Sequence, residues 1–368
     1  MKGTTVFVGL AGLAFGLIIG IFILSPETET TVSGDGDTVV SDIQTVEPVR
    51  WKMASSFSGN LILLGTQGNF VEERVRTLSG GAMELKFFEP GALVPALEIF
   101  DAVSTGSVNA GWTGSGYWAG KVPALQFFTA VPFGPDAGEG LAWMYYGGGL
   151  ELMQEIYARH NIYSQPCSLI SPEGSGWFNK EINSVEDLKG LKMRFFGLGA
   201  KVMEKLGVST QLLAAGDIFP ALELGTIDAT EFSNPAIDLE LGFYQVAKHY
   251  YFPGWHQPMS MIELMVNLDD WNGLGETQKE IINAVCKESL LQSFANGEAI
   301  QFAALQELQA KGVTVHRWSP EIMEALETAW NEVVEDEASK NEDFARVWGS
   351  LKEFRRGYKI WGDLGYLD

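Results

Sequence analysis

The pattern of apolar and polar positions predicts a chain in which short strands alternate with helices. Apolar runs near Arg50 (VRWKMAS) and Phe87 (MELKFFEPG) predict two strands, and residues 60–81 between them have helical periodicity that a glycine pair closes. A predicted helix from about Pro95 leads into a further strand, VNAGWTG. Short apolar strands separated by helices are typical of an α/β body with parallel pairing.

A second set of alternations begins near Gly176 and predicts a β-α-β-α-β unit of its own. After the aromatic-rich HYYFPGWHQP, an apolar strand (SMIELMVN) returns, and helical patterns interrupted by the strand VTVHRW fill residues 277–361. We therefore predict two α/β lobes joined by crossing strands, a ligand cleft between the lobes, and closure about a hinge.

The first residues have the features of an export signal. Lys2 is the only charge before an apolar run over residues 6–24, which is also long enough to cross a bilayer as a helix. A cleaved signal peptide and a retained anchor therefore both remain open, and either one sends the rest of the chain out of the cytoplasm. The predicted organisation is a signal peptide or membrane anchor over 1–25, a disordered linker over 26–46, a first lobe over 47–170 completed by part of 260–318, a second lobe over 171–259, a crossing strand and connecting helix over 260–318, and a C-terminal helical tail over 319–368.

The charge balance excludes one class of partner. The chain has 47 acidic against 25 basic residues and a formal net charge of -22, so it has no basic surplus with which to bind nucleic acid. The overall field also repels anions, so an anionic ligand needs a local positive group.

Two cysteines, Cys167 and Cys286, occur in this exported context, where a disulfide is chemically allowed. The sequence does not show whether they lie within reach of each other. We expect two buried thiols, because a fold of this size needs no covalent cross-link.

The common catalytic signatures are missing from the sequence. Residues 114–121 (GSGYWAGK) resemble a phosphate loop, but Ser115 replaces the required first glycine and Val122 replaces the Ser or Thr that binds magnesium. The four histidines have no zinc spacing, and there is no nucleophile elbow. We therefore expect a protein that is not an enzyme.

Three charged residues stand in apolar, glycine-rich surroundings of the second lobe. Arg194 interrupts the strand-like run LKMRFF and needs an anionic partner, which is either a ligand carboxylate or an internal acid such as Glu231. Glu231 stands at the end of the predicted strand IDATE, and Glu173 lies in the turn SPEGSGW. If both carboxylates face one cleft, protonation of one or a hard cation between them relieves their repulsion; otherwise they are solvated loop acids.

Several long segments in the same order resemble the periplasmic binding proteins of tripartite ATP-independent periplasmic (TRAP) transporters, of the DctP type, and especially the branch that binds α-keto or hydroxy acids. The resemblance covers nearly the whole chain after the linker and implies a two-lobe fold, a long connecting helix and closure on the ligand. The segments are WKMASSF, GALVPALEIFDAVSTGSVNAGW, YWAGKVPALQFFTAVPFG, GWFNKEINSVEDLKGLKMRF, IFPALELGTIDATEF, HYYFPGWHQP and FRRGYKIW.

The resemblance also implies a ligand site. Arg194 would pair with the ligand carboxylate, and a sodium or calcium ion would bridge ligand and protein through Glu173, Glu231, the main chain of Phe232, and Gln257. In that branch the turn position is commonly Gln and the position after GWH is commonly acidic. In this chain the acid is at the turn (Glu173) and the amide follows GWH (Gln257), so the formal charge of the site is unchanged although its location differs. Phe232 replaces a common Trp, which keeps an apolar lid and removes an indole donor.

Three further residues are candidate ligand contacts. Tyr117 and Trp118 match an aromatic pair on the first-lobe side of the cleft in relatives. Core packing is the alternative for both, and less so for Tyr117, whose hydroxyl can donate to a ligand oxygen. Asn234 is a candidate hydrogen-bond donor. The helical tail resembles that of relatives which form dimers by exchanging C-terminal helices, and packing on the chain's own lobe is the alternative.

The function implied is that of a periplasmic receptor, free or tethered to the inner membrane, that captures a small monocarboxylate such as pyruvate or lactate for TRAP membrane subunits. The alternative is a ligand sensor that presents its closed form to a membrane signalling receptor. The sequence does not fix the acid or the cation.

Overall fold

The computed structural model describes residues 48–366. The predicted signal or anchor over 1–25 and the linker over 26–46 lie outside these described residues. Within them, no helix combines the length and the apolar character that crossing a membrane requires. The described residues belong to one unit, which comprises residues 46–368.

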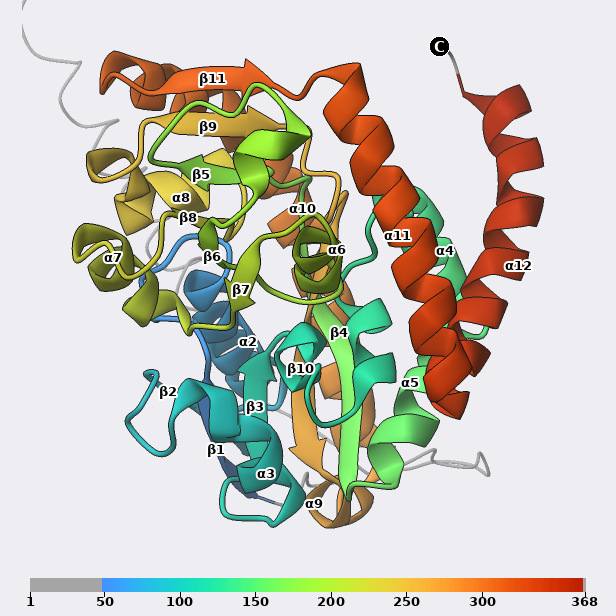
Figure 1. The fold of residues 1–368 in the computed structure, drawn as a ribbon. Coiled ribbons are helices and arrows are strands. Elements are labelled where there is room, and N and C mark those ends of the chain that lie inside the picture. Colours follow the sequence, from blue (N-terminus) through green and yellow to red (C-terminus); the bar gives the residue numbers. More distant parts are fainter. Residues whose placement is uncertain (1–47, 367–368) are drawn as a thin grey trace, which may run out of the picture. The chain divides into compact units, whose positions relative to one another are not determined.

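The two predicted sets of strands form two separate sheets (Figure 1). The first has the order β2-β1-β3-β10-β4, in which β1 is parallel to β2 and β3, whereas β10 is antiparallel to β3 and β4. The last strand of this sheet along the chain, β10, is the predicted SMIELMVN strand, and all eight of its residues are buried. The strands of this sheet are β1 (Val49–Ser55), β2 (Met83–Phe88), β3 (Ala110–Thr113), β4 (Ile162–Ile170) and β10 (Ser260–Asn267).

The second sheet has the order β11-β9-β5-β8-β6-β7. The strand predicted from VTVHRW becomes β11 and pairs in parallel with β9 at the edge of this sheet. β6 lies between β8 and β7 and is parallel to both, so the carboxyl ends of these three strands meet at one edge. The strands are β5 (Gly176–Phe178), β6 (Lys192–Arg194), β7 (Ser209–Gln211), β8 (Ala229–Thr230), β9 (His249–Phe252) and β11 (Thr314–Arg317).

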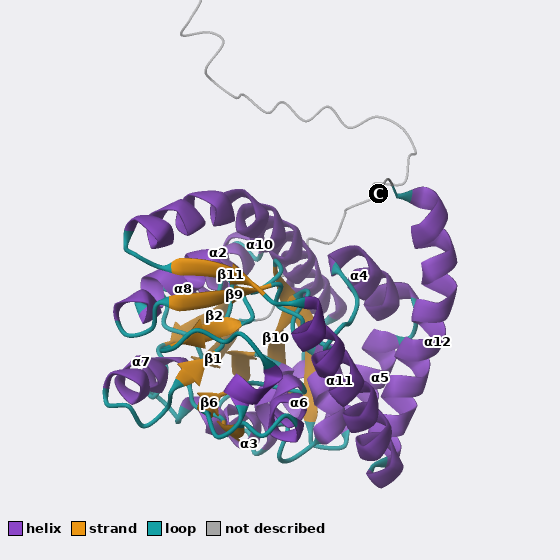
Figure 2. Cartoon of the chain, turned by 45° about the horizontal axis from the view of Figure 1, so that its top comes forward, coloured by secondary structure: helices purple, strands orange, loops and turns teal. Residues whose placement is uncertain are grey.

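Helices surround both sheets (Figure 2). The long helix α10 contacts β4 and α2 beside the first sheet and α8 beside the second, which confirms the predicted connecting helix. The helices are α2 (Gly65–Leu78), α3 (Ile99–Ser104), α4 (Ala137–Tyr146), α5 (Gly149–Ala158), α6 (Gly199–Lys205), α7 (Ala215–Glu223), α8 (Pro235–Leu241), α9 (Leu268–Asn272), α10 (Glu276–Ala310), α11 (Pro320–Lys340) and α12 (Glu342–Gly365), with short 3-10 turns at Ala96–Glu98, Ser115–Trp118, Pro123–Phe128, Val185–Leu188 and Phe243–Gln245.

The C-terminal helices connect the two halves of this unit. Lys205 of α6 pairs with Glu332 of α11 at 2.6 Å, and Arg346 of α12 pairs with Glu155 of α5 at 2.6 Å. The hairpin of α11 and α12 therefore packs on the second-sheet side through α11 and on the first-sheet side through α12 (Figure 1).

Cys167 of β4 and Cys286 of α10 form a disulfide, with their Cα atoms 4.2 Å apart. The expectation of two free thiols was wrong, although both residues are buried as expected. They are 119 positions apart in the sequence, and only the packing of α10 on β4 brings them together. Closing so long a loop removes roughly 4–5 kcal/mol of chain entropy from the unfolded state in the simplest model.

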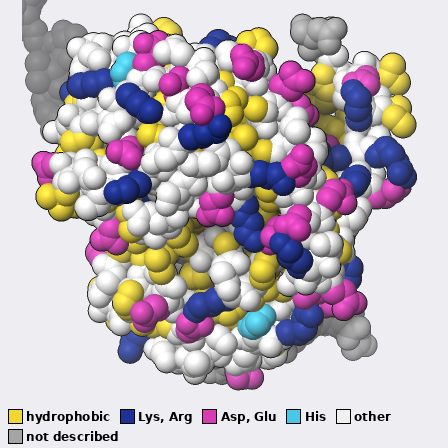
Figure 3. All heavy atoms as spheres, viewed as in Figure 1, with side chains coloured by type: hydrophobic (Ala, Val, Ile, Leu, Met, Phe, Trp, Pro, Cys, Tyr) yellow, Lys and Arg dark blue, Asp and Glu magenta, His cyan; other side chains and the backbone are white. Residues whose placement is uncertain are grey.

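A groove of about 910 Å³ separates surface segments of the two halves. The two walls come from different halves: one is lined by Ser56, Ser58, Asn60, Leu61, Glu89, Pro90, Gly91, Pro95 and Ala96, and the other by Ala214, Ala215, Gly216, Asp217, Glu240 and Leu241. In the space-filling view, acidic and basic side chains are interspersed over the visible face, and apolar atoms gather in the recess between the upper and lower halves (Figure 3).

Candidate functional site

A small cavity of about 30 Å³ lies between the two halves. Its size is close to the volume of one water molecule, so the walls are nearly in contact. Both halves contribute to its lining, which consists of Phe57, Leu64, Gly114, Tyr117, Thr129, Ile170, Ser260 and Ile262 on the first-sheet side and Glu173, Arg194, Phe196, Phe232, Ser233 and Gln257 on the second-sheet side.

Arg194 is the last residue of β6 and is 1% exposed. Since β6 and β8 are parallel, Arg194 lies beside the end of β8 and therefore beside Glu231, which follows that strand. The Nη1 group donates to the backbone oxygen of Glu231 at 2.8 Å and to its Oε1 at 2.7 Å, and Nε donates to the carbonyl of Leu213 at 3.3 Å. None of these hydrogen bonds uses Nη2.

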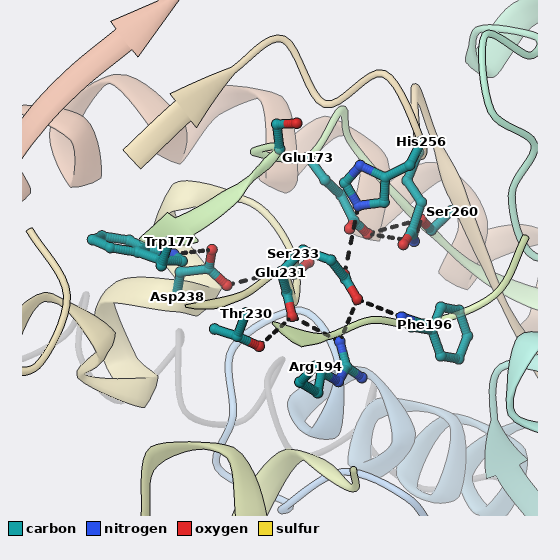
Figure 4. Close-up of polar contacts among 12 residues, drawn as sticks. Glu173, Trp177, Arg194, Phe196, Thr230, Glu231, Ser233, Asp238, His256 and Ser260 are labelled. Carbon is teal, nitrogen blue, oxygen red and sulfur yellow. Dashed lines mark hydrogen bonds and ion pairs between the residues drawn. The ribbon is translucent and has the colours of Figure 1, made fainter. Parts of the chain in front are cut away.

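Glu231 is completely buried and is surrounded by positive groups and donors (Figure 4). Its Oε1 accepts from Arg194 and from the backbone N–H of Phe196 at 2.6 Å, while its Oε2 lies 3.5 Å from Nε2 of His256. Burial by itself would raise the pKa of Glu231, but Arg194 and His256 more than offset this and hold that pKa below its usual value. Glu231 is therefore an anion in the folded protein.

Glu173 occupies the loop between β4 and β5 and is also buried. Its Oε1 accepts from Oγ of Ser260 at 2.8 Å and from Nε2 of Gln257 at 3.1 Å. Burial, followed by repulsion from Glu231, raises the pKa of Glu173 well above its usual value. The two carboxyl groups thus have opposite pKa shifts, because only Glu231 is paired with a cationic side chain.

The structure brings Glu173 and Glu231 together, as the hypothesis of a shared cleft requires. A carboxylate oxygen of Glu173, a carboxylate oxygen of Glu231 and a ring nitrogen of His256 all lie within 4.8 Å of one another, close enough to hold one metal ion. His256 was not among the predicted site residues, because the histidines have no zinc spacing in the sequence. Its position directly before Gln257 was the available signal.

Several polar atoms in this cluster are buried and have no hydrogen-bond partner among the described residues. They are Oε2 of Glu173, Oε2 of Glu231, Oε1 of Gln257 and both ring nitrogens of His256. A buried polar atom without a partner costs about 1–3 kcal/mol, so a cluster of them indicates a place where another group binds. Carboxylate and amide oxygens are the ligands that hard cations such as sodium and calcium prefer, and this donor set fits such an ion.

Two of the predicted aromatic contacts line the cavity. The ring of Tyr117 meets that of Phe196 edge to face, with centroids 4.7 Å apart. Burial raises the pKa of Tyr117 to about 12, so its hydroxyl group remains a donor at neutral pH. The ring of Phe232 lies 5.2 Å from the Arg194 guanidinium, which it shields from solvent.

The other two predicted ligand contacts do not line the cavity. Trp118 is buried in the core and donates from Nε1 to Glu263 at 3.3 Å, which agrees with the core-packing alternative. Asn234 caps α8, since its Oδ1 accepts from the N–H of Ile237 at 3.3 Å and its Nδ2 donates to Ser171 at 3.2 Å. Both polar groups of Asn234 therefore have partners within the protein.

Comparison with known proteins assigns the chain to a family. Residues 59–341 match the bacterial extracellular solute-binding proteins of family 7, the DctP family. A curated monocarboxylate 2-oxoacid-binding periplasmic protein from Nostoc sp. is 40% identical over 332 residues, which are 90% of this chain and 91% of that protein.

Two crystal structures of TRAP solute-binding proteins are also similar. The one from Bordetella bronchiseptica, a dimer with calcium and picolinate in an active site, is 37% identical, has a TM-score of 0.85, and the match covers 87% of this chain and 95% of that one. The one from Pseudoalteromonas atlantica, with bound sodium and pyruvate, is 33% identical, has a TM-score of 0.83, and the match covers 87% and 97%. The chain therefore belongs to family 7 of the bacterial extracellular solute-binding proteins.

Proposed function

We propose that this protein is the extracytoplasmic receptor of a TRAP transporter and that it captures a small 2-oxo or 2-hydroxy monocarboxylate together with a sodium or calcium ion. The observation that carries the proposal is the pairing of buried Arg194 with two buried carboxyl groups, Glu173 and Glu231, at a cavity between the two halves. The ligands of the relatives, 2-oxo acids for the Nostoc protein and pyruvate for the Pseudoalteromonas protein, support the same class of solute.

In this proposal Arg194 binds the ligand carboxylate. Its Nη1 is held by Glu231, so the planar guanidinium is fixed in orientation and presents its remaining edge to the cavity. Tyr117 donates its hydroxyl hydrogen to a ligand oxygen from the opposite wall. Phe196 and Phe232 exclude water, which strengthens each of these electrostatic contacts.

The cation would be held by Glu173, Glu231, Gln257 and the main chain of Phe232. When bound, it supplies positive charge between two carboxylates and to neighbouring ligand oxygens. The raised pKa of Glu173 favours its protonated form, and a cation at this place would offset the repulsion from Glu231 that loss of this proton creates. The bound acid would then connect Arg194 and the cation on the second-sheet side to Tyr117 on the first-sheet side, which favours closure of the two halves.

The described residues offer no activated nucleophile beside the bound acid, and we propose binding without turnover. The solute would be released in the periplasm to TRAP membrane subunits after opening of the cleft. The family supports the extracytoplasmic location, whereas the choice between a cleaved signal and an anchor rests on residues 1–25.

We also propose a homodimer that uses the C-terminal end of α12. Ile360, Trp361, Leu364 and Tyr366 are all more than half exposed there, which is unusual for side chains of this size. The dimer in the crystal structure of the Bordetella relative supports this proposal. Analytical ultracentrifugation of the wild-type protein and of Trp361→Arg tests it, and a monomeric wild type would contradict it.

Isothermal titration calorimetry of the purified full-length protein tests the function. A panel of 2-oxo and 2-hydroxy acids is titrated after chelation, with calcium, sodium or neither restored. We expect binding of a small acid that requires the cation, is lost in Arg194→Ala and persists in Arg74→Ala, which removes an exposed arginine of an ion pair on α2. Binding without any cation would contradict the bridged site, and no binding of any acid would contradict the ligand class.

A further inference from the structure

A buried carboxyl group outside the cavity lining connects the two segments that carry Glu173 and Glu231. Asp238 lies in the first turn of α8 and is 1% exposed. Its Oδ2 accepts from Nε1 of Trp177 at 2.8 Å, and its Oδ1 accepts from the backbone N–H of Ser233 at 3.1 Å (Figure 4). Oδ2 also accepts from the hydroxyl of Tyr250 at 2.9 Å. These donors come from β5, β9 and the loop before α8, so one carboxyl group joins three separate segments.

The contact with Ser233 fixes the loop that follows β8. Ser233 stands two residues after Glu231, and its carbonyl oxygen accepts from the N–H of Gly174 at 3.0 Å and lies 3.4 Å from the hydroxyl of Tyr250. Gly174 directly follows Glu173. The loop of Glu231 and the loop of Glu173 are therefore hydrogen-bonded to each other through the carbonyl of Ser233. Asp238 accepts from the backbone N–H of the same residue.

The Glu173 loop packs directly against the aromatic ring that donates to Asp238. The rings of Trp177 and Tyr250 stack with centroids 4.0 Å apart. A Cβ atom at Gly174 would lie 2.3 Å from ring carbon Cε2 and from the hydroxyl oxygen of Tyr250, so the Glu173 loop lies directly against this ring. Moving the hydroxyl of Tyr250 therefore moves the Glu173 loop.

We propose that Asp238 is a positioning residue that sets the separation of Glu173 and Glu231, and thereby the affinity of the cation site. The inference rests on the proposed function, because it assumes that these two carboxylates share a cation. A carboxylate suits this place because it offers acceptors to three donors, whereas an asparagine would direct its own N–H₂ group at one of them. Groups that orient a metal-binding carboxylate typically change metal affinity by 10–100-fold when they are replaced.

The test compares Asp238→Asn with Glu263→Gln, a matched change of a second buried carboxyl group. Glu263 of β10 also accepts three hydrogen bonds, from Tyr157, Trp118 and Ser164, but these partners belong to the first-sheet side and none of them contacts the loops of Glu173 or Glu231. Calcium alone is titrated calorimetrically into the full-length wild type and both variants, and thermal unfolding is recorded for each. We expect at least about a tenfold loss of calcium affinity in Asp238→Asn and less than about a twofold change in Glu263→Gln.

Tyr250→Phe keeps the ring stack and removes one donor to Asp238, so it provides a milder variant if Asp238→Asn does not fold. We expect it to reduce calcium affinity in the same direction and by a smaller factor. Wild-type calcium affinity in Asp238→Asn or Tyr250→Phe, an equal loss in Glu263→Gln, or no calcium binding by the wild type would overturn the inference. A wild type that binds calcium but no acid would contradict the proposed ligand class and would still decide the role of Asp238.

Discussion

Glu240 and Ile62 connect the two walls of the surface groove by a single hydrogen bond. Oε2 of Glu240, on α8, accepts from the backbone N–H of Ile62, between β1 and α2, at 2.9 Å. Glu240 lies beside the second sheet and Ile62 beside the first, so the bond exists only while the two halves are closed. Neither Glu240 nor Ile62 lines the small cavity that contains Arg194, so this hydrogen bond joins the two halves away from the ligand site.

Glu240→Ala should therefore release the bound acid faster. A net contribution of about 0.5–1.5 kcal/mol from this hydrogen bond corresponds to an increase of roughly 2–10-fold in the dissociation rate, with little change in the association rate. Stopped-flow tryptophan fluorescence measures both rates. Glu240→Gln keeps an acceptor oxygen and should resemble the wild type, so equal rates in all three proteins would show that this bond does not hold the cleft closed.

Arg194→Ala should destabilise the protein as well as abolish acid binding. It leaves the carboxylate of Glu231 buried without its cationic partner, and removal of one partner from a buried ion pair costs about 3–5 kcal/mol. Guanidinium denaturation measures this loss. Arg74→Ala, which breaks an exposed pair with Glu288, should cost no more than about 1 kcal/mol. Equal stability of the two variants would mean that Arg194 and Glu231 are not paired without the ligand.

Cys167→Ser should lower the free energy of unfolding by about 2–5 kcal/mol, because the reduced chain has a much larger unfolded ensemble. Cys286→Ser should have the same effect, and combining the two should add little, since each alone already removes the whole bond. Urea denaturation with and without dithiothreitol measures this. The reductant should lower the midpoint of the wild type only, and an equal shift in the variants would contradict a structural disulfide.

Glu263→Gln should weaken the dependence of stability on pH. Burial raises the pKa of Glu263 to about 7, so the folded state binds this proton more tightly than the unfolded state does. The stabilisation is complete below the ordinary pKa of a glutamate, near pH 4.5, and is lost as the pH rises to about 7. Each such group contributes at most about 1.4 kcal/mol per pH unit.

Denaturation midpoints of the wild type and of Glu263→Gln at intervals between pH 4.5 and 8 measure this difference. We expect the difference in stability between the two proteins to change across this window and to be constant above it. Glu335→Gln, at an exposed carboxyl group on α11, is the control and should leave the slope unchanged between pH 5 and 8. Parallel curves for the wild type and Glu263→Gln would place the titration of Glu263 outside the window.

Local sequence patterns predicted the elements of this fold and the residues of the cavity that lie at strand ends. Apolar runs such as SMIELMVN become buried strands because their periodicity reflects burial directly. Arg194 and Glu231 were found because a charge within or directly after a buried strand needs a partner. Glu173 was singled out as an acid in a glycine-rich turn, whereas Gln257 came only from resemblance to a family, since a loop has no periodicity that marks it.

Only the tertiary structure decided which distant residues meet. The pairing of Cys167 with Cys286 depends on α10 crossing β4, and the addition of His256 to Glu173 and Glu231 depends on three loops from separate segments. Trp118 faces the core instead of the cavity although its neighbour Tyr117 lines it. A sequence determines local propensity and the need of a buried polar group for a partner, whereas the identity of that partner depends on long-range packing, which no local pattern encodes.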